Sequence, residues 1–234
     1  MKDFVKKYGE DKEYLTKIAR YYIDNDSSFT INEVADHFGI SSGNVETAIR
    51  ICIIRNYISY DDAIKVFVKA STNQLQHTAR VTTKTKKYYT KLICKRYDWI
   101  KNHLTDESVK EVVEDYINDT HKRLGLSQRE LNLYLKRGIV CGIATDEETC
   151  DIFRNCLKKI DCPLKEERVT HMLERLIQLR TRVQSIKEII CEVEFQIDTY
   201  DDVYGDSDDA PAKEQLEMKK DELEVSLQKI LETV

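Results

Sequence analysis

Cysteine and histidine are the residue types of this sequence best suited to bind a metal or to act as nucleophiles, but their spacing forms no site. Seven cysteines occur, and the closest four are Cys141, Cys150, Cys156 and Cys162. The gaps between these four are eight, five and five residues, whereas structural zinc sites need closely spaced pairs. The five histidines are scattered, and none has a cysteine or carboxylate at ligand spacing on a helix.

Motifs for catalysis are missing as well. The sequence contains no nucleophile elbow, Walker lysine or HExxH motif. Its glutamates stand beside lysines and arginines, as on the outer positions of a helical pair, and are not isolated in pairs. We therefore predict that the chain is not an enzyme and uses no cofactor and no metal. The odd cysteine count and the lack of an apolar leader favour free, mostly buried thiols in a cytoplasmic protein.

The segment Thr30–Tyr57 has the features of two helices joined by a tight turn. Thr30 precedes Glu33 at the spacing of a capping box. Ala35 falls where the two helices would cross, and Gly39 follows where the turn needs a positive φ. The expected buried face is Val34, Phe38, Ile40, Val45, Ala48 and Ile49. This segment resembles the helix-turn-helix of DNA-binding regulators, and the upstream apolar stripe Leu15, Ile18, Ala19, Tyr22 and Ile23 would complete a trihelical core.

The resemblance implies that the second helix lies in the major groove of double-stranded DNA. Its expected outward residues are Ser41, Ser42, Gly43, Asn44, Thr47 and Arg50. Asn44 would pair with adenine, Arg50 with guanine or phosphate, and the serines with phosphate. These side chains are short, so we expect the module alone to bind weakly. The alternatives are an ordinary helical hairpin, or the same fold used only for protein contacts.

A basic helix over Thr82–Leu104 is predicted to supply further affinity. At 100° per residue, four lysines fall within one narrow sector: Lys84, Lys87, Lys91 and Lys95. Apolar and aromatic residues fall on the opposite side of this helix. The lysines suit phosphate contacts that are salt-sensitive and independent of sequence, although a solvated surface face is the alternative. The stretch Asn73–Tyr89 is similar to the basic segment that follows the helix-turn-helix in the sporulation stage III regulator family, which supports DNA binding.

Composition indicates an all-α protein with two electrostatically different halves. Only seven glycines and two prolines occur, which is too few for an all-β protein. No apolar run approaches the roughly 20 residues of a membrane span, so we predict no membrane contact. Residues 1–105 hold 18 Lys and Arg against 12 Asp and Glu, whereas the rest hold 19 against 30. The two halves are thus expected to have different partners.

Hydrophobic periodicity and capping signals predict ten helices and at most one short hairpin of strands, near Ile139–Ile143. The expected helices are Asp11–Asp24, Ile31–Phe38, Ser42–Asn56, Tyr60–Ala70, Thr82–Asn102, Asp106–Arg123, Gln128–Arg137, Asp146–Lys159, Pro163–Tyr200 and Ala212–Thr233. Capping boxes are also expected at Ser127 with Glu130 and at Thr145 with Glu148.

The strongest pattern predicts a C-terminal coiled coil. Ten consecutive seam positions are apolar: Val169, Met172, Leu176, Leu179, Val183, Ile186, Ile190, Val193, Ile197 and Tyr200. The second arm keeps the spacing at Leu216, Leu223, Leu227, Ile230 and Val234, with Lys220 interrupting it. We expect an antiparallel hairpin with arms of about 37 and 22 residues, near 55 and 33 Å. The longer arm would be left partly uncovered, which suggests packing against the body or a homodimer.

These patterns together predict an all-α chain with four segments. They are a trihelical helix-turn-helix domain (1–58), a basic helical extension (59–104), a helical middle region (105–162) and the coiled-coil hairpin (163–234). The function predicted first is a DNA-binding transcriptional regulator of bacterial or phage origin, with the coiled coil assembling chains or recruiting a protein. The alternative is an anti-CRISPR-like inhibitor from a mobile element, which binds a nucleic-acid-processing enzyme through the acidic hairpin. A structural adaptor is the third possibility.

Overall fold

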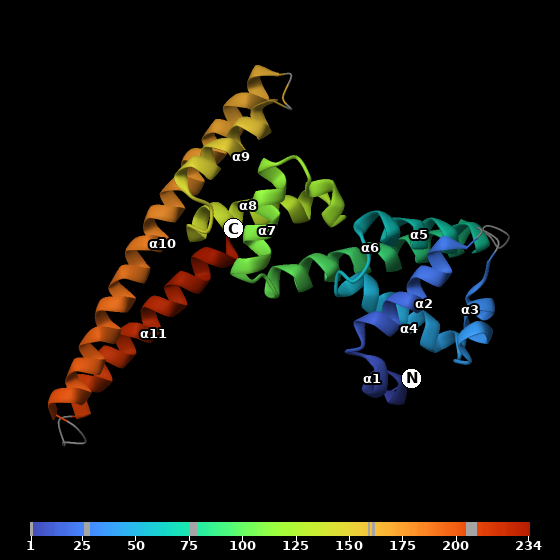
Figure 1. The fold of residues 1–234 in the computed structure, drawn as a ribbon, viewed down its shortest axis with the longest axis horizontal. Coiled ribbons are helices and arrows are strands. Elements are labelled where there is room, and N and C mark those ends of the chain that lie inside the picture. Colours follow the sequence, from blue (N-terminus) through green and yellow to red (C-terminus); the bar gives the residue numbers. More distant parts are fainter. Residues whose placement is uncertain (1, 26–28, 75–78, 159, 161, 205–209) are drawn as a thin grey trace. The chain divides into compact units, whose positions relative to one another are not determined.

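All regular secondary structure in the described part of the chain is helical. The computed structural model describes residues 2–25, 29–74, 79–158, 160, 162–204 and 210–234, and it describes no side chains for residues 2, 71–74, 79–85, 201–204, 210 and 211. No strand occurs in these residues, so the all-α prediction is confirmed (Figure 1). The elements are α1 (Lys2–Tyr8), α2 (Lys12–Asp24), α3 (Ile31–Phe38), α4 (Ser42–Ile54), α5 (Tyr60–Gln74), α6 (Ala79–Asn102), α7 (Asp106–Ile117), the 3-10 helix η1 (His121–Leu124), α8 (Gln128–Cys141), α9 (Asp146–Lys158), α10 (Pro163–Tyr204) and α11 (Ala210–Glu232).

The chain divides into two compact units. The first unit comprises Met1–Leu104 together with His121–Leu131, and the second comprises Thr105–Thr120 together with Asn132–Val234. The first unit therefore contains α1 to α6, η1 and the first residues of α8. The second contains α7, the remainder of α8, and α9 to α11.

The core of the first unit is built around α4. This helix packs against α2, α3 and α6, and α5 packs along α6. The hydrophobic period of α2 and α4 predicts their buried faces correctly. Fully buried residues are Leu15 and Ile18 on α2, and Val45 and Ala48 on α4. Cys52 of α4 is fully buried too, and this burial raises the pKa of its thiol to about 12. Neighbouring helices cover α4 on several sides, so buried residues occupy a large part of its circumference.

A buried arginine ties α6 to two other parts of the first unit. The Arg96 side chain is 0% exposed, and its Nε lies 2.6 Å from Oε1 of Glu130 at the start of α8. The guanidinium also donates to the carbonyl oxygen of Ile58 at 2.7 Å and to the side-chain oxygen of Asn56 at 2.5 Å. Asn56 has a φ of 58°, a left-handed conformation that asparagine tolerates well. All three guanidinium nitrogens therefore have partners, as a buried charge requires.

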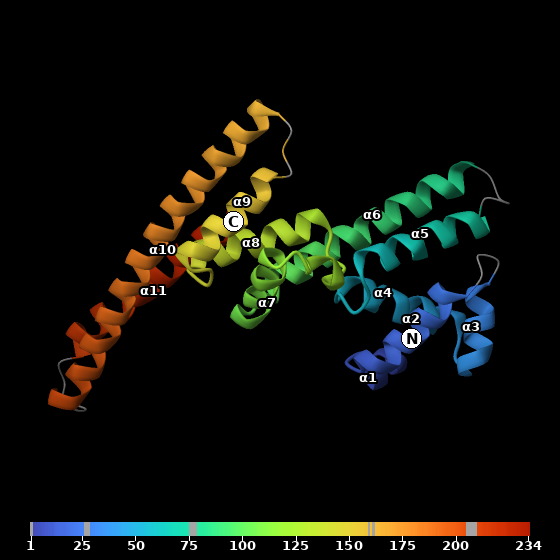
Figure 2. The same ribbon diagram turned by 45° about the horizontal axis from the view of Figure 1, so that its top comes forward.

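Helices α10 and α11 pack side by side in the second unit (Figure 2). The predicted seam residues Leu176, Val183 and Val193 of α10 are buried, and so is Ile230 of α11. Lys220, which interrupts the apolar spacing, has its ammonium group 2.8 Å from a carboxylate oxygen of Glu194 on α10. A charged residue is thus accommodated between the two helices by an opposite charge.

The first half of α10 is covered by the same chain. It packs against α9, and Arg180 of α10 pairs with Asp146 at the start of α9 at 2.9 Å. Leu176 is 6% exposed, although Met172, another predicted seam residue, is 43% exposed. The different lengths of α10 and α11 therefore do not by themselves require a second chain.

Several details of the sequence-based expectations are wrong. The helix expected over Asp106–Arg123 ends at Ile117, and the 3-10 helix η1 follows it. Helix α1 was not expected, and residues 139–141, expected as part of a strand hairpin, belong to α8. Gly138, inside α8, approaches α7 closely: a Cβ there would lie 2.8 Å from a methyl group of Val113. The seven cysteines are free as expected, but only Cys52 is buried, and Cys94, Cys150 and Cys191 are exposed.

No helix among the described residues combines the length and the apolar character needed to cross a membrane.

The Arg96 cluster predicts a large difference between two arginine substitutions. Arg96→Met leaves Glu130 charged and buried, so it should lower the free energy of unfolding by about 3–5 kcal/mol. Arg154 pairs with Asp151 on the surface of α9, and Arg154→Met should cost at most about 1 kcal/mol. Urea titrations followed by helical circular dichroism measure both changes. Equal effects would show that the buried cluster does not stabilise the unit.

Candidate nucleic-acid interface

The turn between α3 and α4 is set by local hydrogen bonds. At the start of α3, Thr30 and Glu33 form the expected capping box, and the two hydrogen bonds from Thr30 lower the pKa of the Glu33 carboxyl. At its end Gly39 adopts φ 62°, in the left-handed region that glycine enters freely. The amide of Ile40 then donates to the carbonyl of Ala35 at 3.0 Å, which closes the helix end. The predicted need for Gly39 is confirmed.

The first turn of α4 presents few free polar side chains. The hydroxyl of Ser41 caps the helix by accepting from the amide of Asn44 at 3.3 Å. The hydroxyl of Ser42 donates to the side-chain oxygen of Asn32 on α3 at 2.6 Å. Ser41 and Gly43 are exposed, and Asn44 is half-buried. The Asn44 side-chain amide forms no hydrogen bond within the described residues, so it is free to bind another molecule.

Thr47 does not lie where the sequence analysis placed it. We expected it on the outer face of α4, but it is 2% exposed. Its hydroxyl donates to the carbonyl of Gly43 one turn earlier at 2.7 Å. The hydroxyl is therefore satisfied inside the helix, which allows its burial. Thr47 as placed here cannot contact a ligand that approaches the outer face.

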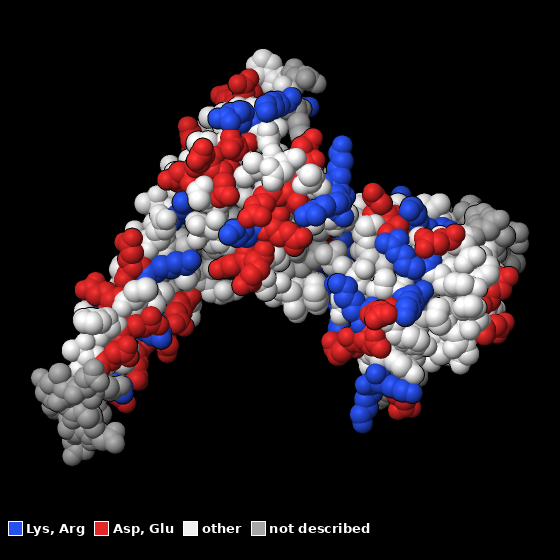
Figure 3. All heavy atoms as spheres, in the orientation of Figure 1, with Lys and Arg blue, Asp and Glu red and all other residues white. Residues whose placement is uncertain are grey.

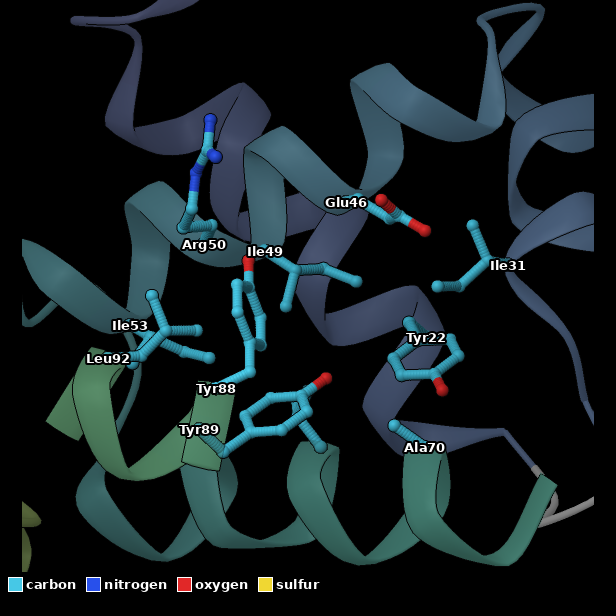
Figure 4. A pocket seen from close by; sticks show the side chains of 11 residues that line it. Tyr22, Ile31, Glu46, Ile49, Arg50, Ile53, Ala70, Tyr88, Tyr89 and Leu92 are labelled. Atoms are coloured by element: carbon cyan, nitrogen blue, oxygen red, sulfur yellow. The ribbon is translucent and has the colours of Figure 1, made fainter. Parts of the chain in front are cut away.

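Arg50 lies further along α4, where α6 approaches this helix. It is half-buried and, together with Glu46, lines a cavity of about 310 Å³. The other side of this cavity includes Tyr88 and Tyr89 of α6 (Figure 4). Glu46 and Tyr88 are exposed at the rim. No hydrogen bond or ion pair involves Glu46 or Arg50 within the described part of the chain.

The lysine row on α6 agrees with its prediction where it is described. Lys87, Lys91 and Lys95 are exposed, whereas Leu92 and Arg96 on the same helix are buried. Among the described residues no carboxylate lies within 4 Å of these three ammonium groups. The side chain of Lys84, the fourth predicted member, lies outside the described residues. Three uncompensated positive charges therefore follow one another along an exposed face.

Helix α6 connects the lysine row to α4. Tyr88 follows Lys87 in the chain and lines the same cavity as Arg50. The described part of the lysine row therefore begins one residue before a residue that lines the cavity between α4 and α6. The first unit contains all the remaining candidate residues, which are Ser41, Ser42, Asn44, Arg50 and the three described lysines. Thr47 is buried and is therefore no longer a candidate for ligand contact.

Two residues that contribute to this arrangement, Tyr88 and Arg96, were not predicted from the sequence. Tyr88 was not singled out, because its position between the lysine sector and the apolar sector has no distinctive periodicity. Arg96 was counted only as one of the positive charges of the basic stretch. Its neighbours Leu92 and Ile100, one turn away on either side, are apolar and buried, and this is the one signal that could have indicated a buried arginine.

The described residues contain no group of three or more His, Cys, Asp and Glu side chains that could hold a metal ion. Comparison of the chain with models of protein families, with curated proteins and with solved structures finds no match in any of the three.

Two glycine substitutions test the turn that positions α4. Gly39→Ala puts a Cβ on a residue with φ 62°, and this should lower the free energy of unfolding by about 1–2 kcal/mol. Gly43→Ala lies inside α4 with open space around it, so it should raise stability by about 0.4–1 kcal/mol. Thermal and urea unfolding report both values. Loss of stability in both variants, or in neither, would contradict the assigned backbone conformation.

Proposed function

We propose that the chain is a DNA-binding regulator whose first unit binds double-stranded DNA. In this proposal α2, α3 and α4 form a trihelical helix-turn-helix, and the first turns of α4 face the base edges. Asn44 contacts adenine, Arg50 contacts guanine or a phosphate, and Ser41 contacts a phosphate. Lys87, Lys91 and Lys95 bind the phosphate backbone.

The observation that carries the proposal is the row of three exposed, uncompensated lysines on the helix that packs against α4. Positive charges without carboxylate partners can each neutralise a phosphate and release counterions. The first turn of α4 offers short side chains, and one of its serines is already bonded to Asn32. The lysines therefore supply most of the affinity, and Asn44 and Arg50 supply the discrimination between sequences.

The second unit has a separate role in this proposal. We propose that α10 and α11 form an antiparallel coiled-coil hairpin that recruits a protein or a second copy of the chain. Carboxylates are spread along both helices, with lysines and arginines between them (Figure 3). DNA would be repelled by the excess of carboxylates, so the hairpin is assigned to protein contacts.

A second candidate function is favoured by the exposed apolar residues of α10 and α11. Phe195 is 71% exposed, Met218 is 59% exposed and Val225 is 52% exposed. Two of these residues lie within two positions of the ion pair between Lys220 and Glu194. Apolar side chains beside acidic ones suit a protein surface, so the hairpin could bind and inhibit a nucleic-acid-processing enzyme. That function requires no duplex binding by the first unit.

The salt dependence of duplex binding tests the proposed function. Replacing Lys87, Lys91 and Lys95 by glutamine should weaken binding to all duplex sequences nearly equally. Each lost phosphate contact should flatten the log–log salt slope by about 0.9, which gives about 2.7 for all three. Fluorescence anisotropy at several salt concentrations measures the slope for the full chain and the variant.

A matched control uses exposed lysines of the second unit. Replacing Lys187, Lys219 and Lys229 by glutamine removes the same total charge but should leave the slope unchanged. Equal slopes for the wild type and the α6 variant would contradict the proposed interface. Absence of salt-dependent duplex binding by the wild type would favour the inhibitor function instead.

A further inference from the structure

A second cavity, of about 520 Å³, lies between α9 and the first half of α10, within the second unit. Its apolar lining consists of Phe153 and Leu157 on α9 and of Leu173 and Ile177 on α10. Ile177 is 45% exposed, so it lies where the cavity opens to solvent. The volume falls within the range of about 300–1,000 Å³ that is usual for small-molecule sites.

The charged side chains that line this cavity already have partners of opposite charge in the chain. Arg180 of α10 pairs with Asp146 at 2.9 Å, and both residues line the cavity. Arg154 pairs with Asp151 on α9. A charged ligand would lose its hydration on entering and would find these ion pairs already formed. The lining therefore favours an uncharged ligand.

One polar group of the lining has no partner in the described part of the chain. Thr149 on α9 is 6% exposed, and its hydroxyl forms no hydrogen bond with any described residue. By contrast, the hydroxyls of Thr47, Thr90 and Thr170 each donate to the carbonyl four residues earlier on their own helix. A buried hydroxyl without a partner is unfavourable. The hydroxyl of Thr149 is therefore available to a molecule that enters the cavity.

We propose that this cavity binds an uncharged, largely apolar molecule with a single hydrogen-bonding group. The polar group of the ligand bonds to the hydroxyl of Thr149, which can either donate or accept. The apolar body of the ligand packs against Phe153 and Leu173. An aromatic ligand suits this lining, because aromatic rings pack favourably against one another in edge or offset geometry. A ring system with one N–H group, such as indole, has this combination of properties.

Calorimetric titration of the full chain without DNA tests this proposal, so the result does not depend on the proposed DNA binding. The probes are indole, 1-methylindole, which lacks the N–H donor, and indole-3-acetate, which adds a carboxylate. Indole should bind saturably at submillimolar concentration. 1-Methylindole should bind about tenfold more weakly, the equivalent of losing about 1.4 kcal/mol. Indole-3-acetate should also bind more weakly than indole, because both arginines of the lining are paired.

The variant Thr149→Val tests the polar contact in two independent ways. It removes the hydroxyl and keeps the shape of the side chain, so it should abolish the preference for indole over 1-methylindole. Without any ligand it should raise the melting temperature by about 2–4 °C, because an unpaired buried hydroxyl is removed. A lower melting temperature would show that the hydroxyl has a partner within the protein, which would overturn its role in binding.

Two matched substitutions on α10 locate the binding site. Ile177→Trp places a larger side chain at the opening of the cavity and should abolish the binding of indole. Ile189 is 39% exposed on the same helix and does not line the cavity, so Ile189→Trp should bind indole as the wild type does. Circular dichroism checks that each variant keeps its helicity. The proposal would be overturned by no saturable binding of indole, by unchanged binding in Ile177→Trp, or by tighter binding of indole-3-acetate than of indole.

Discussion

The buried guanidinium of Arg96 is the interaction on which the arrangement of the first unit depends. Moving a charge out of water is costly, and only complete pairing within the protein offsets that cost. Arg96 meets this demand through Glu130, Ile58 and Asn56, which come from the start of α8 and from the connection between α4 and α5. Because these partners have fixed directions, they set the rotation of α6 about its axis. The same rotation directs the lysine row outward and Tyr88 toward α4.

Glu130 shows how one residue can serve two parts of the fold. One of its carboxylate oxygens accepts from the amide of Ser127 in the capping box, and the other pairs with Arg96. The capping box could be predicted from the sequence because its partners are three residues apart. The pairing with Arg96 could not, because the two residues are 34 positions apart and nothing in the spacing connects them.

The same distinction separates the site residues that could be predicted from those that could not. The turn at Gly39 and the outward lysines follow from local geometry and from helical period, and both agree with the structure. Thr47 lies on α4, which packs against α2, α3 and α6. More of the surface of α4 is therefore covered than a motif of two helices implies, and Thr47 is buried as a result. The hydrophobic period of α10 predicted which of its positions are buried. The period could not indicate that α9 packs against the first half of α10, because that contact depends on the tertiary fold.

The central claim is that the first unit, and not the paired helices α10 and α11, contacts duplex DNA. Backbone amide NMR of the full chain, titrated with a duplex at low salt, tests it most directly. We predict that shift changes concentrate at residues 41–50, which cap and begin α4, and at residues 87–95 of α6, while the amides of α10 and α11 stay unchanged. Shift changes confined to α10 and α11, or no changes at saturating duplex concentration, would contradict it.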